Sequence, residues 1–135
     1  MSAMPDTAPT RVDALILFAH GARDPRWAAP FVAVAEAIAA ARPALRVPLA
    51  YLECMTPDLL HAGSELAGAG CSAIHVVPMF LGAGGHVRQD LPALVRTLRD
   101  AHPQVAFTLQ PPIGELDAIT QAMARAIVAT VESQR

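Results

Sequence analysis

The sequence contains no lysine, two cysteines and few aromatic residues, and each scarcity excludes some chemistry. All ten basic residues are arginine, so a Schiff-base lysine and the lysine of a nucleotide-binding P-loop are both absent. Aromatic residues make up 4% of the chain and the net charge is −2. Without a dominant basic patch, we do not expect a nucleic-acid-binding protein.

Targeting signals are also lacking. The first ten residues have no apolar core of the kind that signal peptides need, and no run approaches the roughly 18 apolar residues of a membrane span. Cys54 and Cys71 form no CxxC pair and predict ordinary reduced thiols. We therefore expect a flexible tail over residues 1–11 and a cytoplasmic protein without a membrane partner.

Apolar residues are abundant instead. Hydrophobic residues make up 53% of the 135 residues and charged residues 16%, which excludes an intrinsically disordered chain. The length fits one domain, which we place at residues 12–135. The apolar excess must be buried in that domain or at a subunit interface.

Short apolar runs predict the strands. They span residues 12–19, 45–52, 73–80 and 104–109. The first and third runs are almost continuously apolar, which is typical of strands covered on both faces in a parallel sheet.

The segments between and after these runs have the apolar spacing of helices. The apolar positions run from Trp27 to Ile38, from Leu59 to Ala67, from Leu91 to Leu98 and from Leu116 to Val131. Thr56 before Pro57 predicts the N-cap of the second helix. The order β-α-β-α-β-α-β-α predicts an α/β domain, a small parallel sheet with helices on both faces. Ligands bind such sheets beyond the carboxyl ends of the strands.

Three side chains that can bind metals follow three of these strands. His20 follows the first strand, Glu53 the second, and His86 closes the loop after the third. Imidazole and carboxylate together suit Co²⁺, Ni²⁺, Fe²⁺ or Zn²⁺. The alternatives remain open: a loop histidine is often only solvated or hydrogen-bonded, and Glu53 could cap a turn or pair with an arginine.

The other histidines fit structural positions better. His61 and His102 are predicted to lie in or at the ends of helices, and His75 inside the third strand as a buried, hydrogen-bonded residue. We do not expect them to bind a metal.

A glycine-rich loop precedes His86. Its residues are Leu81, Gly82, Ala83, Gly84 and Gly85. Such a loop can cradle phosphate, form a side-chain-free wall for a planar ligand, or simply turn the chain. The absence of GxGxxG and GK[ST] patterns disfavours the phosphate cradle.

Other enzyme signatures are missing. The chain has no GxSxG motif for a serine hydrolase. A histidine phosphatase begins with Arg-His-Gly, whereas Ala19 precedes His20 here.

These motifs resemble the short sirohydrochlorin chelatases of the CbiX type. The segment His20-Gly21-Ala22-Arg23-Asp24 resembles that family's His-Gly-Ser-Arg-Asp opening, with alanine in place of serine. Residues 76–81 and 85–92 resemble its second signature, and Tyr51-Leu52-Glu53 its Phe-Leu-Glu segment. The similarity extends from about Leu15 to Val131.

The resemblance implies a class II chelatase-like (flavodoxin-like) domain that inserts a divalent metal ion into sirohydrochlorin without ATP. It implies Co²⁺ for cobalamin or Fe²⁺ for siroheme, with Ni²⁺ in archaeal relatives, and no cofactor beyond this substrate metal. It also implies a homodimer, because longer relatives contain two copies of the domain. Of these metals we favour cobalt. A metal or tetrapyrrole carrier without turnover is the alternative from another class.

The resemblance also implies roles for individual residues. His20 and His86 would bind the metal, His20 would accept a pyrrole proton, and Glu53 would assist. The loop 81–85 together with His86 would lie against the macrocycle. Arg23 and Arg88, with Arg26 beside them, would bind its carboxylates.

Overall fold

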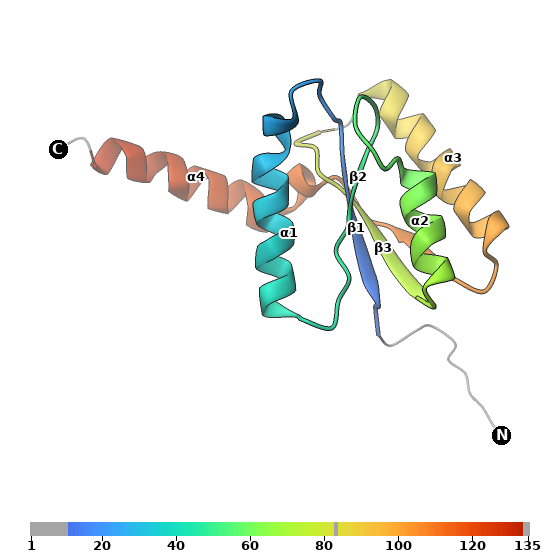
Figure 1. Cartoon of the computed structure of the whole chain (residues 1–135). Coiled ribbons are helices and arrows are strands. Elements are labelled where there is room, and N and C mark those ends of the chain that lie inside the picture. The colour runs from blue at the N-terminus through green and yellow to red at the C-terminus, as the bar shows by residue number, and fades with distance from the viewer. Residues whose placement is uncertain (1–10, 83, 134–135) are drawn as a thin grey trace.

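A parallel sheet forms the centre of the molecule. The computed structural model describes residues 11–82 and 84–133, and these form four strands in the order β2-β1-β3-β4, all parallel. The strands are β1 (Ala14–Ala19), β2 (Leu49–Tyr51), β3 (Ala73–Pro78) and β4 (Ala106–Leu109). The predicted alternation of strands and helices is confirmed (Figure 1).

Helices connect and follow the strands. They are α1 (Ala29–Ala41), α2 (Leu59–Gly68), α3 (Gly85–Ala101) and α4 (Asp117–Glu132). Two short 3₁₀ helices, η1 (Pro25–Ala28) and η2 (Ile113–Glu115), precede α1 and α4. The helix α1 lies on one face of the sheet, and α2 and α3 lie on the other (Figure 1).

The apolar core lies between the sheet and the pair α2 and α3. Ile16 and Phe18 of β1 are fully buried there beside Ile74 and Val76 of β3. Leu59, Val95 and Leu98 of the two helices complete this core. Burial of each large side chain stabilises the fold by about 1.5–3 kcal/mol, so β1 and β3 are fixed as the inner strands of the sheet.

Several predicted boundaries differ from the structure, and two of the differences have a clear physical reason. The second strand begins at Leu49 rather than Leu45, because the proline at position 48 has no N–H to donate to a sheet. Helix α2 begins at Leu59, and its N-cap is Asp58 rather than Thr56. The Asp58 carboxylate accepts the His61 N–H at 2.9 Å, and aspartate is a stronger N-cap than threonine.

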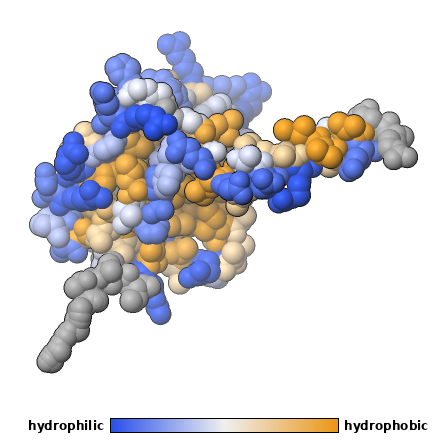
Figure 2. Space-filling view, turned by 180° about the vertical axis from the view of Figure 1, so that it is seen from behind, coloured by the Kyte–Doolittle hydropathy of each residue, from blue (hydrophilic) through white to orange (hydrophobic). Residues whose placement is uncertain are grey.

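The last helix does not cover the sheet. Helix α4 projects from the body and packs chiefly on η2 (Figure 1). Among its described residues none is buried, and Ile127, Val128 and Val131 are 64%, 53% and 67% exposed. Figure 2 shows hydrophobic surface on the projecting helix. This arrangement leaves a helix-sized apolar surface without a partner within the described chain.

A matching gap lies on the sheet. On the α1 side, α1 packs on β1 and β2, whereas His75 and Val77 of β3 are only partly buried and Thr108 of β4 is exposed. Parallel sheets are normally covered on both faces. The half-sheet formed by β3 and β4 therefore lacks a helix on this side within the described residues.

Two further points concern the limits of the chain. Residues 1–10 of the predicted tail lie outside the described residues, so the predicted boundary at residues 11 and 12 stays a prediction. Across residues 11–82 and 84–133, none of the helices is long and apolar enough to cross a membrane.

Candidate functional site

His20 and Glu53 meet at the carboxyl edge of the sheet. The His20 Nε2 lies 3.1 Å from the Glu53 Oε2, and the two side chains are 52% and 59% exposed. An imidazole hydrogen-bonded to a carboxylate can take up a proton and keep the resulting charge stabilised. Both groups are open to solvent, so a hydrated ion or a macrocycle can reach them.

The backbone brings this pair together. The strand pairing of β1 and β2 continues past their ends, with the Glu53 N–H donating to the His20 carbonyl oxygen at 3.1 Å. Gly21 has φ +91°, and a Cβ built there would overlap the Glu53 carbonyl oxygen. Glycine at this position therefore allows the close approach on which the His20–Glu53 contact depends.

His86 comes from a different segment of the sequence than His20 and Glu53. It is the second residue of α3, and its side chain is exposed. Within residues 11–82 and 84–133 no three side chains of histidine, cysteine, aspartate or glutamate come close enough to hold a metal ion. The structure thus assembles the predicted His20–Glu53 part of the site, and the metal-binding role of His86 stays a prediction.

The glycine loop is open to solvent. Leu81 is 70% exposed, and a Cβ built on Gly82, Gly84 or Gly85 would meet no atom within 4 Å. Ala83 lies outside the described residues. None of these three described glycines has a φ in the left-handed region, so the backbone does not require glycine at these positions. The open space beside these glycines would let a planar ligand lie against the loop.

The three candidate arginines differ in their surroundings. Arg23 is exposed three residues after His20. Arg26 binds Asp24, with Nη2 and Oδ2 2.7 Å apart, and these hydrogen bonds lower the pKa of the Asp24 carboxyl. Arg26 is thus held against its own loop. Arg88 pairs with Glu115, with Nη2 and Oε2 3.1 Å apart.

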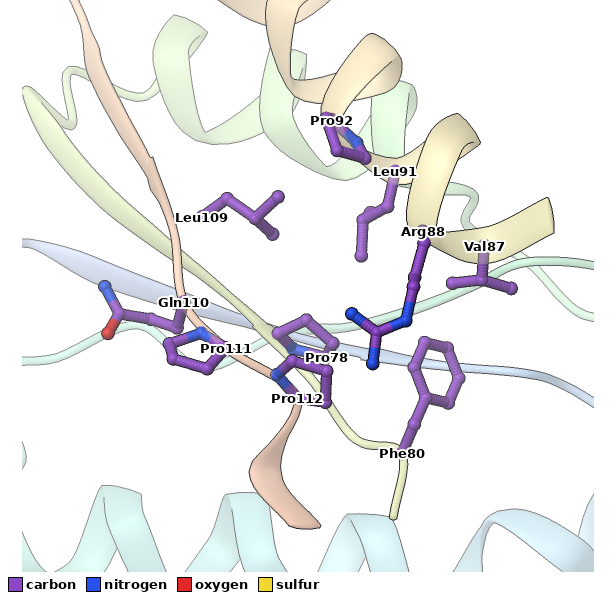
Figure 3. A pocket seen from close by; sticks show the side chains of 10 residues that line it. All are labelled: Pro78, Phe80, Val87, Arg88, Leu91, Pro92, Leu109, Gln110, Pro111 and Pro112. Carbon is purple, nitrogen blue, oxygen red and sulfur yellow. The ribbon is translucent and has the colours of Figure 1, made fainter. Parts of the chain in front are cut away.

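A cavity of about 290 Å³ lies beside Arg88. Its lining comes from the end of β3, the first turns of α3 and the segment after β4: Pro78, Phe80, Val87, Arg88, Leu91, Pro92, Leu109, Gln110, Pro111 and Pro112. Figure 3 shows the Arg88 side chain reaching toward Pro78 and Pro112. Sequence reasoning missed this cavity and Glu115, although the rule that ligands bind beyond the carboxyl ends of the strands points to this edge of the sheet.

The other described histidines and Cys71 have other surroundings than the His20–Glu53 pair. His61 bonds to Asp58 in the first turn of α2, and His102 follows α3 and bonds to the Ser64 hydroxyl at 3.0 Å. Both positions confirm the predictions. His75 lies in β3 as predicted but is only partly buried. Burial raises the pKa of the Cys71 thiol, which disfavours a reactive thiolate there.

Known proteins share both sequence and fold with this chain. The sequence pattern of the CbiX family matches residues 14–130. The chain is 26% identical over 119 residues to a sirohydrochlorin cobaltochelatase from Saccharolobus solfataricus, an alignment that covers 84% of this chain and 91% of that protein.

Solved structures agree. A structure described as a CbiX protein of cobalamin biosynthesis from Marinobacter aquaeolei VT8 superposes with a TM-score of 0.78 at 32% identity, covering 89% of this chain and 98% of that one. The sirohydrochlorin chelatase SirB from Bacillus subtilis subspecies spizizenii, solved with cobalt, shares the fold with a TM-score of 0.72 at 22% identity. That alignment covers 86% of this chain and 50% of SirB. With the family pattern matched from the first strand to the last helix, the chain belongs to the CbiX family.

Proposed function

We propose that the protein is a chelatase that inserts a divalent metal ion into sirohydrochlorin. Membership of the CbiX family over residues 14–130 carries this proposal. It is supported by the relative from Saccharolobus solfataricus, which is named a sirohydrochlorin cobaltochelatase, and by the pairing of an imidazole with a carboxylate at the sheet edge.

The His20–Glu53 pair supplies the proton chemistry. Metal insertion must release two pyrrole N–H protons, and a neutral imidazole accepts a proton near neutral pH. When His20 takes up a proton, the Glu53 carboxylate at 3.1 Å stabilises the imidazolium by a charge-assisted hydrogen bond. Glu53 can also hold the hydrated ion or accept the second proton.

His86 and the glycine loop complete the proposal. His86 is exposed immediately after Gly85, so its imidazole is available to bind the incoming ion. The open space beside Gly82, Gly84 and Gly85 would let the flat macrocycle approach the backbone. Arg23 and Arg88 would bind carboxylates of the tetrapyrrole.

Cobalt is the metal that we favour. Imidazole and carboxylate ligands suit Co²⁺ but also Fe²⁺, so a ferrochelatase of siroheme synthesis is the second candidate. SirB, which shares the fold, was solved with cobalt and, in another structure, with Fe³⁺, so this fold can hold both elements.

A homodimer is the assembly that we propose. Helix α4 exposes an apolar face that packs on no sheet, and the β3–β4 half-sheet has a face that no helix covers. The two surfaces could therefore cover each other. Reciprocal packing of each α4 on the half-sheet of a second copy would cover both surfaces. The free thiols Cys54 and Cys71 suit a reducing compartment, and we place the protein in the cytoplasm.

An absorbance assay tests the function. Sirohydrochlorin is mixed with Co²⁺ or Fe²⁺, and the spectrum is followed with catalytic amounts of protein. We expect many turnovers per protein molecule, fastest with Co²⁺. A spectral change that stops at one equivalent of protein would instead indicate a carrier.

A further inference from the structure

The cavity beside Arg88 adjoins the proposed site. Phe80 immediately precedes the glycine loop, and Val87 immediately follows His86; both line the cavity. Its volume of about 290 Å³ is far larger than a single water molecule requires. A group attached to a macrocycle lying on the glycine loop could therefore enter it.

The lining is apolar apart from Arg88 and Gln110. Phe80, Val87 and the prolines form apolar walls, and Arg88 is the charged residue among those of the described chain that line the space. Figure 3 shows Phe80 and Val87 beside the Arg88 side chain. This combination fits a short aliphatic stem that ends in a carboxylate.

The Arg88 guanidinium is already paired with a carboxylate. Glu115 Oε2 lies 3.1 Å from Arg88 Nη2, and the two side chains are 42% and 60% exposed. Exposed ion pairs of this kind contribute little to stability, so another carboxylate could exchange with Glu115.

The 3₁₀ helix η2 does not depend on this ion pair for its position. The Gly114 N–H donates to the Phe80 carbonyl oxygen at 2.9 Å, and the Glu115 N–H donates to the Pro112 carbonyl oxygen at 2.9 Å. A Cβ built on Gly114 would overlap the Leu81 backbone, so this turn packs closely on the start of the glycine loop. The Glu115 side chain can therefore move away while η2 stays in place.

We propose that this cavity binds one carboxyl-bearing side arm of the tetrapyrrole, and that Glu115 occupies Arg88 until that arm displaces it. The inference rests on the proposed function, since sirohydrochlorin carries eight carboxylates. Glu115 is then a specificity-determining residue that competes with the substrate, and its removal strengthens substrate binding.

Titrations of sirohydrochlorin without metal test the exchange. Dissociation constants are measured by absorbance for the wild type, R88Q, E115Q and the double variant, each shown to be folded by circular dichroism. We expect R88Q to weaken binding about tenfold or more and E115Q to tighten it about two- to fivefold. In the double variant, the E115Q substitution should no longer tighten binding, because the Arg88 guanidinium for which Glu115 competes is absent.

Two further variants separate the alternatives. E36Q removes one exposed acidic charge on α1 and should leave binding unchanged. V87W fills the cavity from its apolar side, and it should weaken tetrapyrrole binding without changing Co²⁺ binding.

Several outcomes would overturn the inference. Weaker binding by E115Q would mean that the ion pair is a structural clasp. Tightening that persists in the R88Q background would mean a general charge effect, and unchanged binding by both E115Q and V87W would mean that the cavity stays outside the substrate site. If the wild type itself fails to bind sirohydrochlorin, the proposed function falls together with the inference.

Discussion

His20 and Glu53 lie 33 residues apart in the chain, yet their side chains meet at 3.1 Å. The contact is built by the backbone: the Glu53 N–H bonds to the His20 carbonyl oxygen, and Gly21 leaves room for the Glu53 carbonyl group. The imidazole is thereby held beside a carboxylate before any metal or tetrapyrrole arrives. In the proposed reaction, the carboxylate is thus already in place beside the imidazole that accepts the proton.

The first prediction concerns this pair. H20A should lower the rate of metal insertion at least ~100-fold, because it removes both the proton acceptor and a metal ligand. E53Q should lower it about tenfold, because the imidazolium loses its charged partner. The rates are measured by absorbance under conditions of many turnovers. H102A is the matched control, because His102, which follows α3, bonds to the Ser64 hydroxyl. Near-normal turnover by H20A would refute the assignment.

The second prediction separates His86 from the fold. Its side chain is exposed in the first turn of α3, so H86A should unfold at nearly the wild-type temperature. We expect metal insertion to be lost and Co²⁺ affinity to fall about 10- to 100-fold. Calorimetric titration with Co²⁺ measures the affinity. An unchanged affinity together with normal turnover would exclude His86 from the site.

The third prediction tests the glycine wall. Gly85 needs no positive φ and has open space around it, so G85V should cost less than about 1 kcal/mol of stability. The β-branched side chain would nevertheless stand where the macrocycle is proposed to lie. We expect weaker sirohydrochlorin binding with unchanged Co²⁺ binding, measured by two separate titrations.

The contrasting variant is G21A. Gly21 has φ +91° and no room for a Cβ, so G21A should lower both stability and activity. If G85V binds the tetrapyrrole normally, the loop is an ordinary turn.

The fourth prediction concerns α4. Ile127 and Val131 are 64% and 67% exposed on this helix. An aspartate at either position should dissociate the proposed homodimer, because it places a charge in an apolar interface. Light scattering should report a dimer for the wild type at micromolar concentration and a monomer for I127D and V131D.

The control for α4 is Q121D, which changes an exposed polar residue of the same helix. It should remain dimeric. A wild type that is monomeric at micromolar concentration would rule out the proposed assembly.

The fifth prediction is a pH dependence of stability. The Asp13 carboxylate accepts hydrogen bonds from the Ser72 N–H, the Ser72 hydroxyl and the Ala73 N–H, and these lower its pKa below the ordinary 3.8. A lowered folded-state pKa means that the stabilisation is complete above the ordinary value and is lost as the pH falls through the lowered one.

D13N should therefore unfold with about 1–2 kcal/mol less free energy than the wild type at pH 7. The difference should shrink in acid, below the ordinary pKa. Urea unfolding at several pH values measures it, and a constant difference across this range would contradict the prediction.

Continuous apolar runs made the sheet predictable from the sequence. The runs that became β1 and β3 form the two inner strands of the sheet, where an almost continuously apolar composition is typical. The sheet-edge rule then located His20 and Glu53 on neighbouring strand ends. Their contact itself depends on a backbone pairing beyond the strands, which no spacing in the sequence reveals.

Other features depend on geometry that the sequence does not encode locally. The apolar spacing from Leu116 predicts a helix. It does not determine whether that helix packs on its own sheet or on another surface. Arg88 and Glu115 are 27 residues apart, and their pairing depends on where η2 packs. The N-cap is Asp58 rather than Thr56 because the extended Asp58 pairs with Tyr51 in a parallel bridge directly before α2.

In the proposed homodimer, the composition of α4 has a consequence for which chains can pair. From Asp117 to Glu132 the helix carries one arginine and two acidic residues, so charge offers little discrimination against a related partner. A cell with two diverged copies of such a gene would be expected to form mixed pairs as well as matched ones. A mixed dimer would contain one unchanged subunit and one altered subunit, and selection could then act on each subunit separately.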